Sequence, residues 1–425
     1  AADECVAPPS LLTRSGRSAG AGRRGATHSS AAILYGFYDA SRPPTIASVS
    51  PAAAVLGRDV TVVAGGTNFA PPRGLHCALR RCNVPHTLVC AYDVDDSALR
   101  VYRHNSPATP LSGADIVSLS DAELARGGGG LWLLSPPCQP YSRQGLQLGA
   151  RDGRSAALLH LLDVLERADA AALPAFLLLE NVAGFESSET RRRLHAVLAA
   201  RGFATREVWA SPSHFGVPNQ RTRYFMLARR LGAFAAAPPE IERLLLDAAA
   251  VQAACEGGER VPPPTGEAED AGACAPLSDF LEPSAAGGDE ALAALAVGDH
   301  VLERYGAAMD LVGRHSRRSC CFTKNYSRFV KGAGSVLAEG LPAGAAPPAV
   351  KDLAALRPLR LRFFAPAEIA RLHGFGAGEL AFPPEVGRKK QFELLGNSLS
   401  VTVVAHLLRF LLAESPAPAE VAEAA

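Results

Sequence analysis

The stretch SAALLHLLDVLERADAAALPAFLLLENV, residues 155–182, contains the pattern that decides the fold. In its first half, apolar side chains recur at helical spacing, which predicts an amphipathic helix over residues 155–168. Its second half holds the short apolar run AFLLL, residues 175–179, which predicts a buried strand that ends just before Glu180 and Asn181. A helix that leads into a buried strand in this way is typical of a βαβ unit.

The same alternation of helix and strand continues on both sides of this unit, starting at Gly74. The other predicted helices are residues 74–82, 97–104 and 190–202, and the other predicted strands are 88–93, 131–134, 205–210 and 223–228. Strands separated by helices of this length predict the α/β class and a doubly wound, mostly parallel sheet. In such sheets, ligands bind at the carboxyl ends of the strands.

Composition limits the classes of protein to consider. The chain has 425 residues and a formal net charge of +1, so a nucleic-acid partner would need a local basic patch. The nine cysteines include no CxxC pair, which suggests neither a disulfide framework nor a metal site. Reduced cysteines are typical of intracellular proteins, so we expect a cytoplasmic location, with the nucleus as a further one. No apolar run approaches the roughly 20 residues that span a bilayer, so we expect no membrane segment.

Three residues with reactive side chains come just after predicted strands. Asp93, Cys138 and Glu180 each come just after the end of one, so the fold rule predicts that they are neighbours at one rim of the sheet. An isolated cysteine at a strand end is more often structural. In SPPCQP, however, Pro136 and Pro137 restrict the backbone and can aim the Cys138 thiol before a substrate arrives. This context favours a nucleophile.

Glu180 and two arginines extend this group. A lone glutamate in a loop is usually solvated, but a partly buried one beside a nucleophile has a raised pKa and can donate a proton. Arg221 and Arg223 in PNQRTRYF are spaced to lie on one side of a strand. Such a pair is usually a solvated face, and here it could instead hold an anionic nucleotide or polarise a base carbonyl.

Several motifs resemble those of the cytosine-5 methyltransferases, in the order in which that family has them. They are SPPCQPYSRQG, LLLENVAGF, VPNQRTRYF and LLGNSLSV. Two further segments, CFTKNYSRFVKGAGSVL and LRFFAPAEIARLHGF, resemble the subfamily that was classed with DNA methyltransferases but methylates the anticodon loop of aspartate tRNA. The resemblance extends from Gly74 to about Leu412.

The resemblance implies a Rossmann-like methyltransferase sheet with a smaller target-recognition region. It also implies roles for residues: Cys138 adds to carbon six of cytosine, Glu180 protonates the ring nitrogen, Arg221 and Arg223 assist on the base, and Asn181 orders the loop. Carbon five then takes a methyl group from S-adenosylmethionine. Covalent addition of this kind makes an unreactive aromatic carbon nucleophilic.

The resemblance also implies a binding site for S-adenosylmethionine. Asp93 should bind the ribose hydroxyls, as an acid at that position does in dinucleotide folds. The other implied cofactor residues are Phe69, Gly74, Leu75, Val94, Asp115, Ile116, Pro137, Asn397 and Ser398. In NFAPPRGLH, Pro71 and Arg73 replace glycines of the family's first motif. Either Gly65 and Gly66 supply the turn instead, or the segment is aberrant. Arg73 could meet the methionine carboxylate even without a glycine turn.

For RNA, a basic cluster surrounds CFTKNY. The candidate contacts are Arg317, Arg318, Phe322, Lys324, Tyr326 and Arg328, with Arg314 and Lys331 beside them and Arg388, Lys389 and Lys390 as an extension. Interleaved aromatic side chains suit splayed, single-stranded bases.

Region boundaries follow from composition and from the resemblance. We expect a basic disordered tail at 1–42, although a transit peptide has similar composition. The remaining regions are an IPT/TIG-like fragment or aberrant segment at 43–73, a catalytic domain at 57–232, a linker or insertion at 233–300, a target-recognition region at 301–365, a return to the catalytic domain at 366–412 and a disordered tail at 413–425.

Three functions remain open at this point. The first is a monomeric tRNA cytosine-5 methyltransferase without a metal. The second is a DNA cytosine-5 methyltransferase, which is disfavoured because the segment between Arg223 and Cys321 contains no obvious DNA-reading module. The third is an RNA-binding relative that has lost the cofactor.

Overall fold

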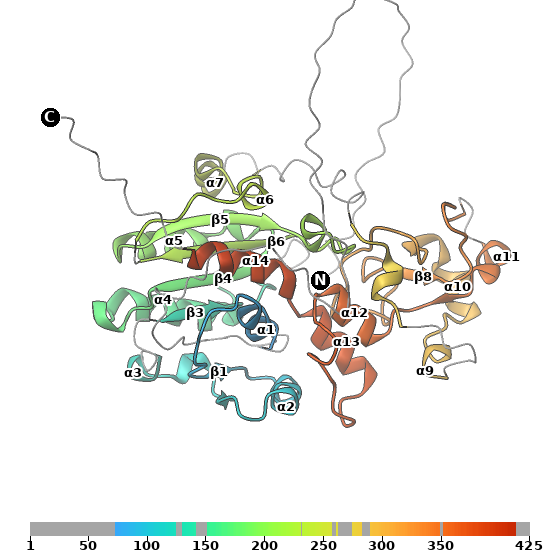
Figure 1. Ribbon diagram of the computed structural model, residues 1–425, viewed down its shortest axis with the longest axis horizontal. Helices are drawn as coiled ribbons and strands as arrows, with labels where there is room; N and C mark the ends of the chain where they lie inside the picture. Colours follow the sequence, from blue (N-terminus) through green and yellow to red (C-terminus); the bar gives the residue numbers. More distant parts are fainter. Residues whose placement is uncertain are drawn as a thin grey trace, which may run out of the picture.

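The computed structural model describes residues 73–124, 130–141, 151–230, 232–256, 261, 274–282, 290–348 and 352–413. These residues form two lobes that lie side by side, with α12 and α13 between them (Figure 1). The expectations for the two tails, for the segment 43–72 and for Phe69, including the glycine turn at Gly65 and Gly66, fall outside the described residues.

The larger lobe is built on a four-stranded sheet in the order β3-β4-β6-β5. Its strands are β3 (Leu131–Leu134), β4 (Phe176–Val182), β5 (Ala204–Ala210) and β6 (Arg223–Arg229). β3 and β4 are parallel, whereas β6 is antiparallel to both β4 and β5. Since β5 has the same direction as β3 and β4, the prediction of a mostly parallel sheet is confirmed, with β6 as the one reversed strand among the described residues of this sheet. Because β6 runs backwards, its first residues lie at the edge where β4 ends.

A second, two-stranded sheet consists of β1 (Ala91–Tyr92) and β2 (Leu111–Ser112), which are parallel. β1 is shorter than the predicted strand over 88–93, but Asp93 directly follows it, as expected. α2 (Asp96–Asn105) begins just beyond, and the Asp95 side chain caps it by accepting hydrogen bonds from the backbone N–H groups of Ser97 and Ala98.

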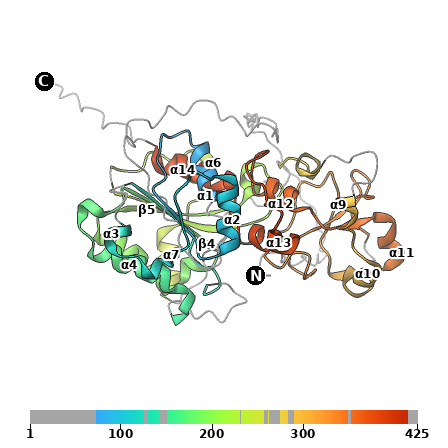
Figure 2. The same ribbon diagram turned by 90° about the horizontal axis from the view of Figure 1, so that it is seen from below.

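Helices cover both faces of the four-stranded sheet. α1 (Arg73–Arg81) and α14 (Val401–Leu412) pack together on one face, and α4 (Ala156–Arg167) covers the other (Figure 2). α5 (Glu189–Ala200) shares the core of α4. Alternate residues of β4 point into the two cores, so its seven residues are all buried. This burial explains why AFLLL is continuously apolar instead of alternating with polar residues.

α14 is the most apolar helix of the larger lobe. The segment Arg388–Leu412 has the length and composition of a membrane span, but 78% of its most apolar window is buried inside the protein. The segment is also interrupted, because α13 ends at Gly396 and Ser400 caps the start of α14. It is therefore a core helix preceded by a loop.

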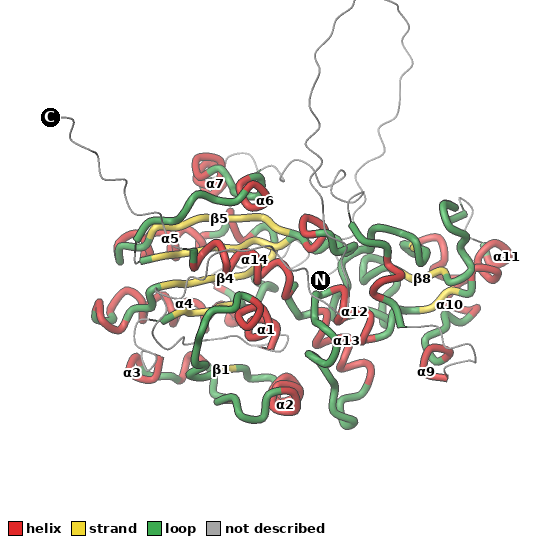
Figure 3. Tube along the Cα trace, viewed as in Figure 1, coloured by secondary structure: helices red, strands yellow, loops and turns green. Residues whose placement is uncertain are grey.

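The smaller lobe contains a three-stranded sheet in the order β7-β8-β9 and mostly loops around it (Figure 3). Its elements are α9 (Glu290–Ala293), α10 (Asp299–Tyr305), β7 (Leu311–Val312), β8 (Val336–Ala338), α11 (Leu353–Leu356) and β9 (Leu361–Arg362). A separate apolar core that includes Leu302, Val336 and Leu356 supports it. Three further helices are α3 (Asp121–Leu124), α12 (Pro366–Leu372) and α13 (Arg388–Gly396).

The described parts of 233–300 pack against the larger lobe, so of the two alternatives they fit an insertion better than a linker. α6 (Pro239–Glu242) and α7 (Ala248–Cys255) bury Ile241 and Val251 against the two cores of the larger lobe. The following residues also bury apolar side chains, among them Phe280. The composition of 233–300, which is rich in Ala, Pro and Gly, did not indicate that these apolar side chains are buried.

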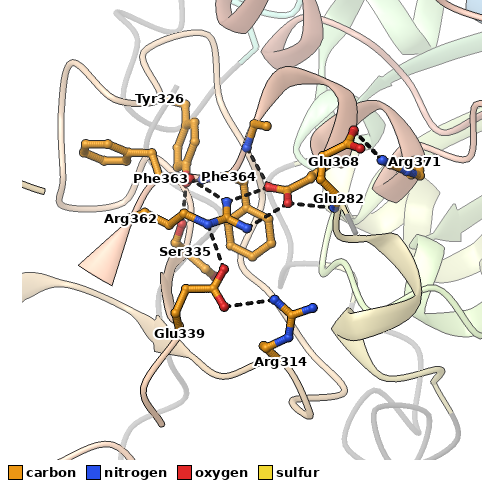
Figure 4. Close-up of polar contacts among 11 residues, drawn as sticks. Glu282, Arg314, Tyr326, Ser335, Glu339, Arg362, Phe363, Phe364, Glu368 and Arg371 are labelled. Atoms are coloured by element: carbon orange, nitrogen blue, oxygen red, sulfur yellow. Dashed lines mark hydrogen bonds and ion pairs between the residues drawn. The ribbon is translucent and has the colours of Figure 1, made fainter. Parts of the chain in front are cut away.

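A network of ion pairs joins the two lobes where β9 leads into α12 (Figure 4). The carboxylate of Glu368 is fully buried and accepts two hydrogen bonds from Arg362, both 2.8 Å long. It also accepts from the Glu282 backbone N–H at 3.0 Å. Arg362 donates a third bond to Glu339, which Arg314 also contacts at 2.9 Å. The bidentate bonds tie β9 of the smaller lobe to α12.

Candidate active site

The loop that carries Cys138 is held between β3 and β4. Leu134, the last residue of β3, is paired with Leu179, so the loop begins beside Glu180. The Asn181 side-chain amide donates to the carbonyl of Pro136 at 3.3 Å, which confirms the prediction that Asn181 orders the loop. The Cys138 side chain is partly exposed, as a nucleophile must be.

The turn after β4 presses against the same loop. Gly184 has a φ of +110°, and a Cβ atom there would lie 3.3 Å from the carbonyl oxygen of Tyr141. Glycine is therefore required both for the backbone conformation and for the close approach. The Tyr141 hydroxyl donates to Thr190 at 3.1 Å, and its ring packs edge-on against Phe185. These contacts anchor the far end of the cysteine loop.

Glu180 and Arg223 form a buried ion pair. Glu180 lies inside β4, not after it as predicted, and is paired with Phe225. Arg223 is two residues before Phe225 on the antiparallel strand, so the two side chains are diagonal neighbours on one face of the sheet. The Arg223 Nε atom lies 3.4 Å from the Glu180 carboxylate, and both side chains are about nine-tenths buried. The arginine is thus placed to control the charge of the proposed acid.

Both terminal nitrogens of Arg221 bind groups of the protein, whereas its buried Nε has no hydrogen-bond partner among the described residues, and the role on the base stays a prediction. Its Nη1 donates to the Phe322 carbonyl at 3.2 Å, and its Nη2 donates to the carbonyls of Gly396 and Ser398. The side chain is only 3% exposed. Arg221 therefore holds residues 321–329, which we call the CFT segment, against the loop before α14 and is a positioning residue.

Cys321 is a site residue whose individual role the sequence did not indicate. Its sulfur accepts a hydrogen bond from Arg221 at 3.0 Å and lies 4.0 Å from Nη2 of Arg223. In the sequence, the CFT segment served only to indicate the subfamily. The structure brings it from the smaller lobe to Arg221 and Arg223. A lone buried cysteine gives no sequence signal for such a contact.

Gly396 permits this close packing. A methyl group on Gly396 would overlap the backbone of Thr323 and Lys324. The φ of Gly396 is ordinary, so the requirement is the absence of a side chain and not an unusual conformation.

We expect Gly396→Ala to lower the free energy of unfolding by about 1–3 kcal/mol, because the overlapping atoms are backbone and cannot rotate away. Urea denaturation measures the change. Gly153→Ala is the matched control: Gly153 has nothing within 4 Å of its Cβ position and is exposed. Its effect should stay within about 0.5 kcal/mol. Equal stability of the two variants would contradict the packing described for Gly396.

A second polar group lies at the edge of β1. Asp93 is 1% exposed, and its Oδ1 accepts the backbone N–H of Asp95 at 2.8 Å. Its Oδ2 is buried and has no partner among the described residues. Burial raises the pKa of this carboxyl to about 8. An acceptor that is buried without a donor is costly unless a ligand supplies the donor.

The neighbouring residues complete this edge. Asp115 is exposed and caps a short 3-10 helix by accepting the Val117 N–H at 3.1 Å. Val94, Pro137, Asn397 and Ser398 lie in loops, with Ser398 buried and Val94 and Asn397 partly exposed. The side chains of Leu75 and Ile116 are buried in the two cores, so they contribute packing.

The Arg73 guanidinium makes contacts within the protein, and its suggested contact with the methionine carboxylate stays a prediction. Its Nη1 donates to the Asn105 carbonyl at 3.1 Å, and its remaining contacts are with Ser106 and the Glu379 carbonyl. The guanidinium is therefore used to join α1 to the end of α2. Glycine at position 74 allows close packing of α1 against Leu399, because a Cβ atom there would lie 3.1 Å from the Leu399 side chain.

Two of the predicted RNA contacts are wrong. Phe322 and Tyr326 are 1% and 3% exposed and pack edge-on against each other. The Tyr326 hydroxyl donates to the Ser335 carbonyl and accepts the Phe364 N–H, at 2.7 and 2.8 Å (Figure 4). They are core residues because the segment folds back on the smaller lobe, and neither ring can stack on a base.

Several of the predicted basic contacts are already paired. Arg318 forms an ion pair with Asp310 at 2.8 Å, and Arg317 donates to the Cys274 carbonyl. Lys390 bridges Asp95 and Glu393, which ties α13 to the cofactor edge. In contrast, Lys324, Arg328 and Lys331 form no ion pair with any residue that the structure describes, and Arg328 and Lys331 are exposed. Within the same residues, no group of three or more His, Cys, Asp or Glu could hold a metal ion.

Comparison with known proteins places this geometry in context. The family model for C-5 cytosine-specific DNA methylases matches residues 69–243. The chain is 35% identical over 385 residues to the tRNA (cytosine(38)-C(5))-methyltransferase of Mus musculus, covering 80% of this chain and 90% of that protein. It is 31% identical over 356 residues to the DNA (cytosine-5)-methyltransferase of Dictyostelium discoideum, covering 80% of this chain and 91% of that protein. The crystal structure of the S. pombe Dnmt2 methyltransferase matches with a TM-score of 0.64 and 29% identity, covering 83% of this chain and 98% of that one.

Proposed function

Because the chain belongs to the family of C-5 cytosine-specific methylases, we propose that it transfers a methyl group from S-adenosylmethionine to carbon five of a cytosine in tRNA. The observation that carries the proposal is the convergence of a partly exposed Cys138 with the buried Glu180–Arg223 pair. The tRNA relatives, which match over most of both chains, support the choice of RNA.

Cys138 supplies the nucleophile. Its thiolate attacks carbon six of the cytosine, which forms a sulfur–carbon bond and moves electron density toward carbon five. Carbon five would then take the methyl group while the sulfur–methyl bond of the donor breaks, with the electron pair of that bond staying on the donor's sulfur. Loss of the proton from carbon five and rupture of the sulfur–carbon bond restore the aromatic ring and free the thiolate. The restrained SPPC loop, held by Asn181, keeps the sulfur in place through these steps.

Glu180 manages charge on the base. Addition of the thiolate places negative charge on the ring, and a proton or hydrogen bond at ring nitrogen three relieves it. Glu180 is positioned to supply this proton, and Arg223 beside it stabilises the carboxylate that remains. Arg221 acts one step further away, by holding the Cys321 segment against Arg223.

The residues at the edge of β1 fit the methyl donor that the family uses. S-adenosylmethionine, when bound, supplies an electrophilic methyl group. The unpartnered Oδ2 of Asp93 would accept a ribose hydroxyl, and Val94 and Asp115 would contact the adenine. Asn397 and Ser398 would lie at the methionine end. Lys390 strengthens this edge by binding Asp95, whose backbone N–H holds Asp93 in place.

We expect the affinity for S-adenosylmethionine to increase from pH 6 to pH 9, by up to about tenfold per unit below the Asp93 pKa. Burial raises the pKa of Asp93 to about 8, so the carboxyl is largely protonated at neutral pH until a ligand binds. Hydrogen bonds from the ribose favour the ionised carboxylate, so binding releases a proton in this range. Calorimetry at four pH values measures the slope. Asp93→Asn should bind weakly and without this slope, and a parent profile that is flat would contradict the assignment.

The substrate is tested by offering two nucleic acids. The purified full-length chain is incubated with methyl-labelled S-adenosylmethionine and either total tRNA or duplex DNA. The proposal expects label in 5-methylcytidine of tRNA and none in DNA. Label in DNA alone would favour the DNA methyltransferase. Binding of tRNA without transfer to either substrate would favour the cofactor-defective alternative.

A further inference from the structure

We propose that Phe329 is a stacking platform for one unpaired base of the bound RNA, an inference that rests on the proposed function and adds a second base-binding position to it. The first is the site of the reacting cytosine at Cys138. The second would be formed by the loop 324–331 of the smaller lobe, where an aromatic face lies with two exposed cations, Arg328 and Lys331, and the partly exposed Lys324.

Phe329 is unusual in its exposure. It is 53% exposed and is one of only three large apolar side chains on the surface of the described residues, with Val117 and Tyr305. The two other aromatic residues of the CFT segment, Phe322 and Tyr326, are buried. The segment therefore keeps two aromatic rings in its core and places the third in solvent, where burial offers no reason for an aromatic side chain.

The loop holds Phe329 in a fixed position. The backbone N–H groups of Arg328 and Phe329 both donate to the Asn325 carbonyl at 3.0 Å. Ser327 adopts a φ of +66°, which closes the turn. Tyr326 anchors the loop to the core through its hydroxyl bond to Ser335. An exposed ring on such a restrained turn loses little conformational freedom when a base stacks on it.

The charges around Phe329 match a nucleic-acid backbone. The Arg328 guanidinium lies over the ring, 5.5 Å from its centroid. Lys324, Arg328 and Lys331 have no acidic partner in the part of the chain that the structure describes, whereas Arg314 and Arg318 are neutralised by Glu339 and Asp310. An aromatic face with free cations is the combination that binds single-stranded nucleic acid, with bases on the ring and phosphates on the cations.

The loop 324–331 lies close enough to the active site for one RNA loop to reach both. The loop begins just after Phe322, whose carbonyl is bound by Arg221, and Lys324 packs on Gly396. Phe329 is seven residues beyond Phe322, so the chain can separate them by about 25 Å at most. A base on Phe329 would thus belong to the same loop of RNA as the target cytosine.

Equilibrium binding tests the inference. Phe329→Ala should weaken binding of a tRNA transcript about 5- to 150-fold, the loss of one stacked base. Phe329→Trp should bind at least as well as the parent, and Phe329→Leu should resemble the alanine variant, since leucine keeps apolar area but has no π face. A fully paired RNA duplex, which presents no free base, should bind the parent and Phe329→Ala equally.

Salt dependence separates the ring from the cations. Phe329→Ala should leave the slope of log affinity against log salt unchanged, because it removes no charge. Lys331→Ala should reduce that slope by about 0.7–0.9. Tyr305→Ala is the matched control: Tyr305 is 40% exposed with Arg304 over its ring, but it lies on α10, away from the larger lobe (Figure 1). It should change neither affinity nor slope.

Three results would overturn the inference: tRNA affinity of Phe329→Ala within about twofold of the parent, an equal loss for the duplex, or the same loss in Tyr305→Ala. Methyl transfer by the parent is measured in parallel. A parent that methylates tRNA but is indifferent to Phe329 contradicts only this inference. A parent that needs Phe329 for binding but methylates no tRNA contradicts the proposed function and leaves the stacking platform intact.

Discussion

Replacement of Cys138 with alanine is expected to reduce methyl transfer by at least about 10⁴-fold, because no other group can form the bond to carbon six. Binding of tRNA should change little, since the thiol contributes one small contact to a large interface. Single-turnover rates with saturating tRNA measure the first effect, and a binding titration measures the second. Loss of both together would indicate misfolding instead of a missing nucleophile.

Two control variants sharpen this result. Cys138→Ser keeps the shape but offers a hydroxyl, which is a far weaker nucleophile at neutral pH, so it should be nearly as inactive as the alanine variant. Cys255→Ala removes another partly exposed cysteine, located on α7, and should retain the parent rate. A rate for Cys138→Ala within about tenfold of the parent would show that the cysteine is not the nucleophile.

Glu180→Gln should reduce the rate of transfer by about 10²- to 10⁴-fold, the usual contribution of a positioned acid. Glutamine preserves the shape but carries no acidic proton, and its amide leaves Arg223 without its anionic partner. The affinity for tRNA should fall much less than the rate. Glu180→Asp keeps a carboxyl group but places it one methylene further from the base, so it should lose less activity than the glutamine variant. An unchanged rate in Glu180→Gln would assign the proton to another group.

The core of the catalytic group could be predicted from sequence because local patterns determine it. β3 and residues 176–179 of β4 are buried and pair in parallel, so the residues that follow these paired segments had to share a rim. That rule is sufficient to bring Cys138, Glu180 and Asn181 together. Asp93 follows from the same rule, although its strand is only two residues long.

Other features depend on long-range topology that local patterns do not contain. The direction of β6 decides that Arg221 and Arg223 reach the active-site rim, and nothing in RYFMLAR indicates an antiparallel strand. Period-two spacing suggested equivalent roles for the two arginines, but Arg221 meets carbonyls from residues more than 100 positions away. Only the folded chain distinguishes the two.

The RNA contacts show a different limit. A run of basic and aromatic residues predicts a nucleic-acid surface, but not which rings face outward. In the CFT segment, Tyr326 is buried because the Ser335 carbonyl and the Phe364 N–H satisfy its hydroxyl. Phe329, three residues later, is exposed beyond a turn. Likewise, charge alone could not reveal that Arg318 is neutralised by Asp310.

The central claim is that Cys138 forms a covalent bond to the target cytosine in tRNA. It is tested most directly with a tRNA transcript that contains 5-fluorocytosine, because fluorine at carbon five cannot leave as a proton does and the adduct is trapped. After incubation with S-adenosylmethionine and proteolysis, mass spectrometry identifies the modified peptide. We expect a methylated fluorocytosine nucleotide on the peptide that contains Cys138. A complex attached through Cys321 or another residue, or no covalent complex in a preparation that methylates tRNA, would contradict the account.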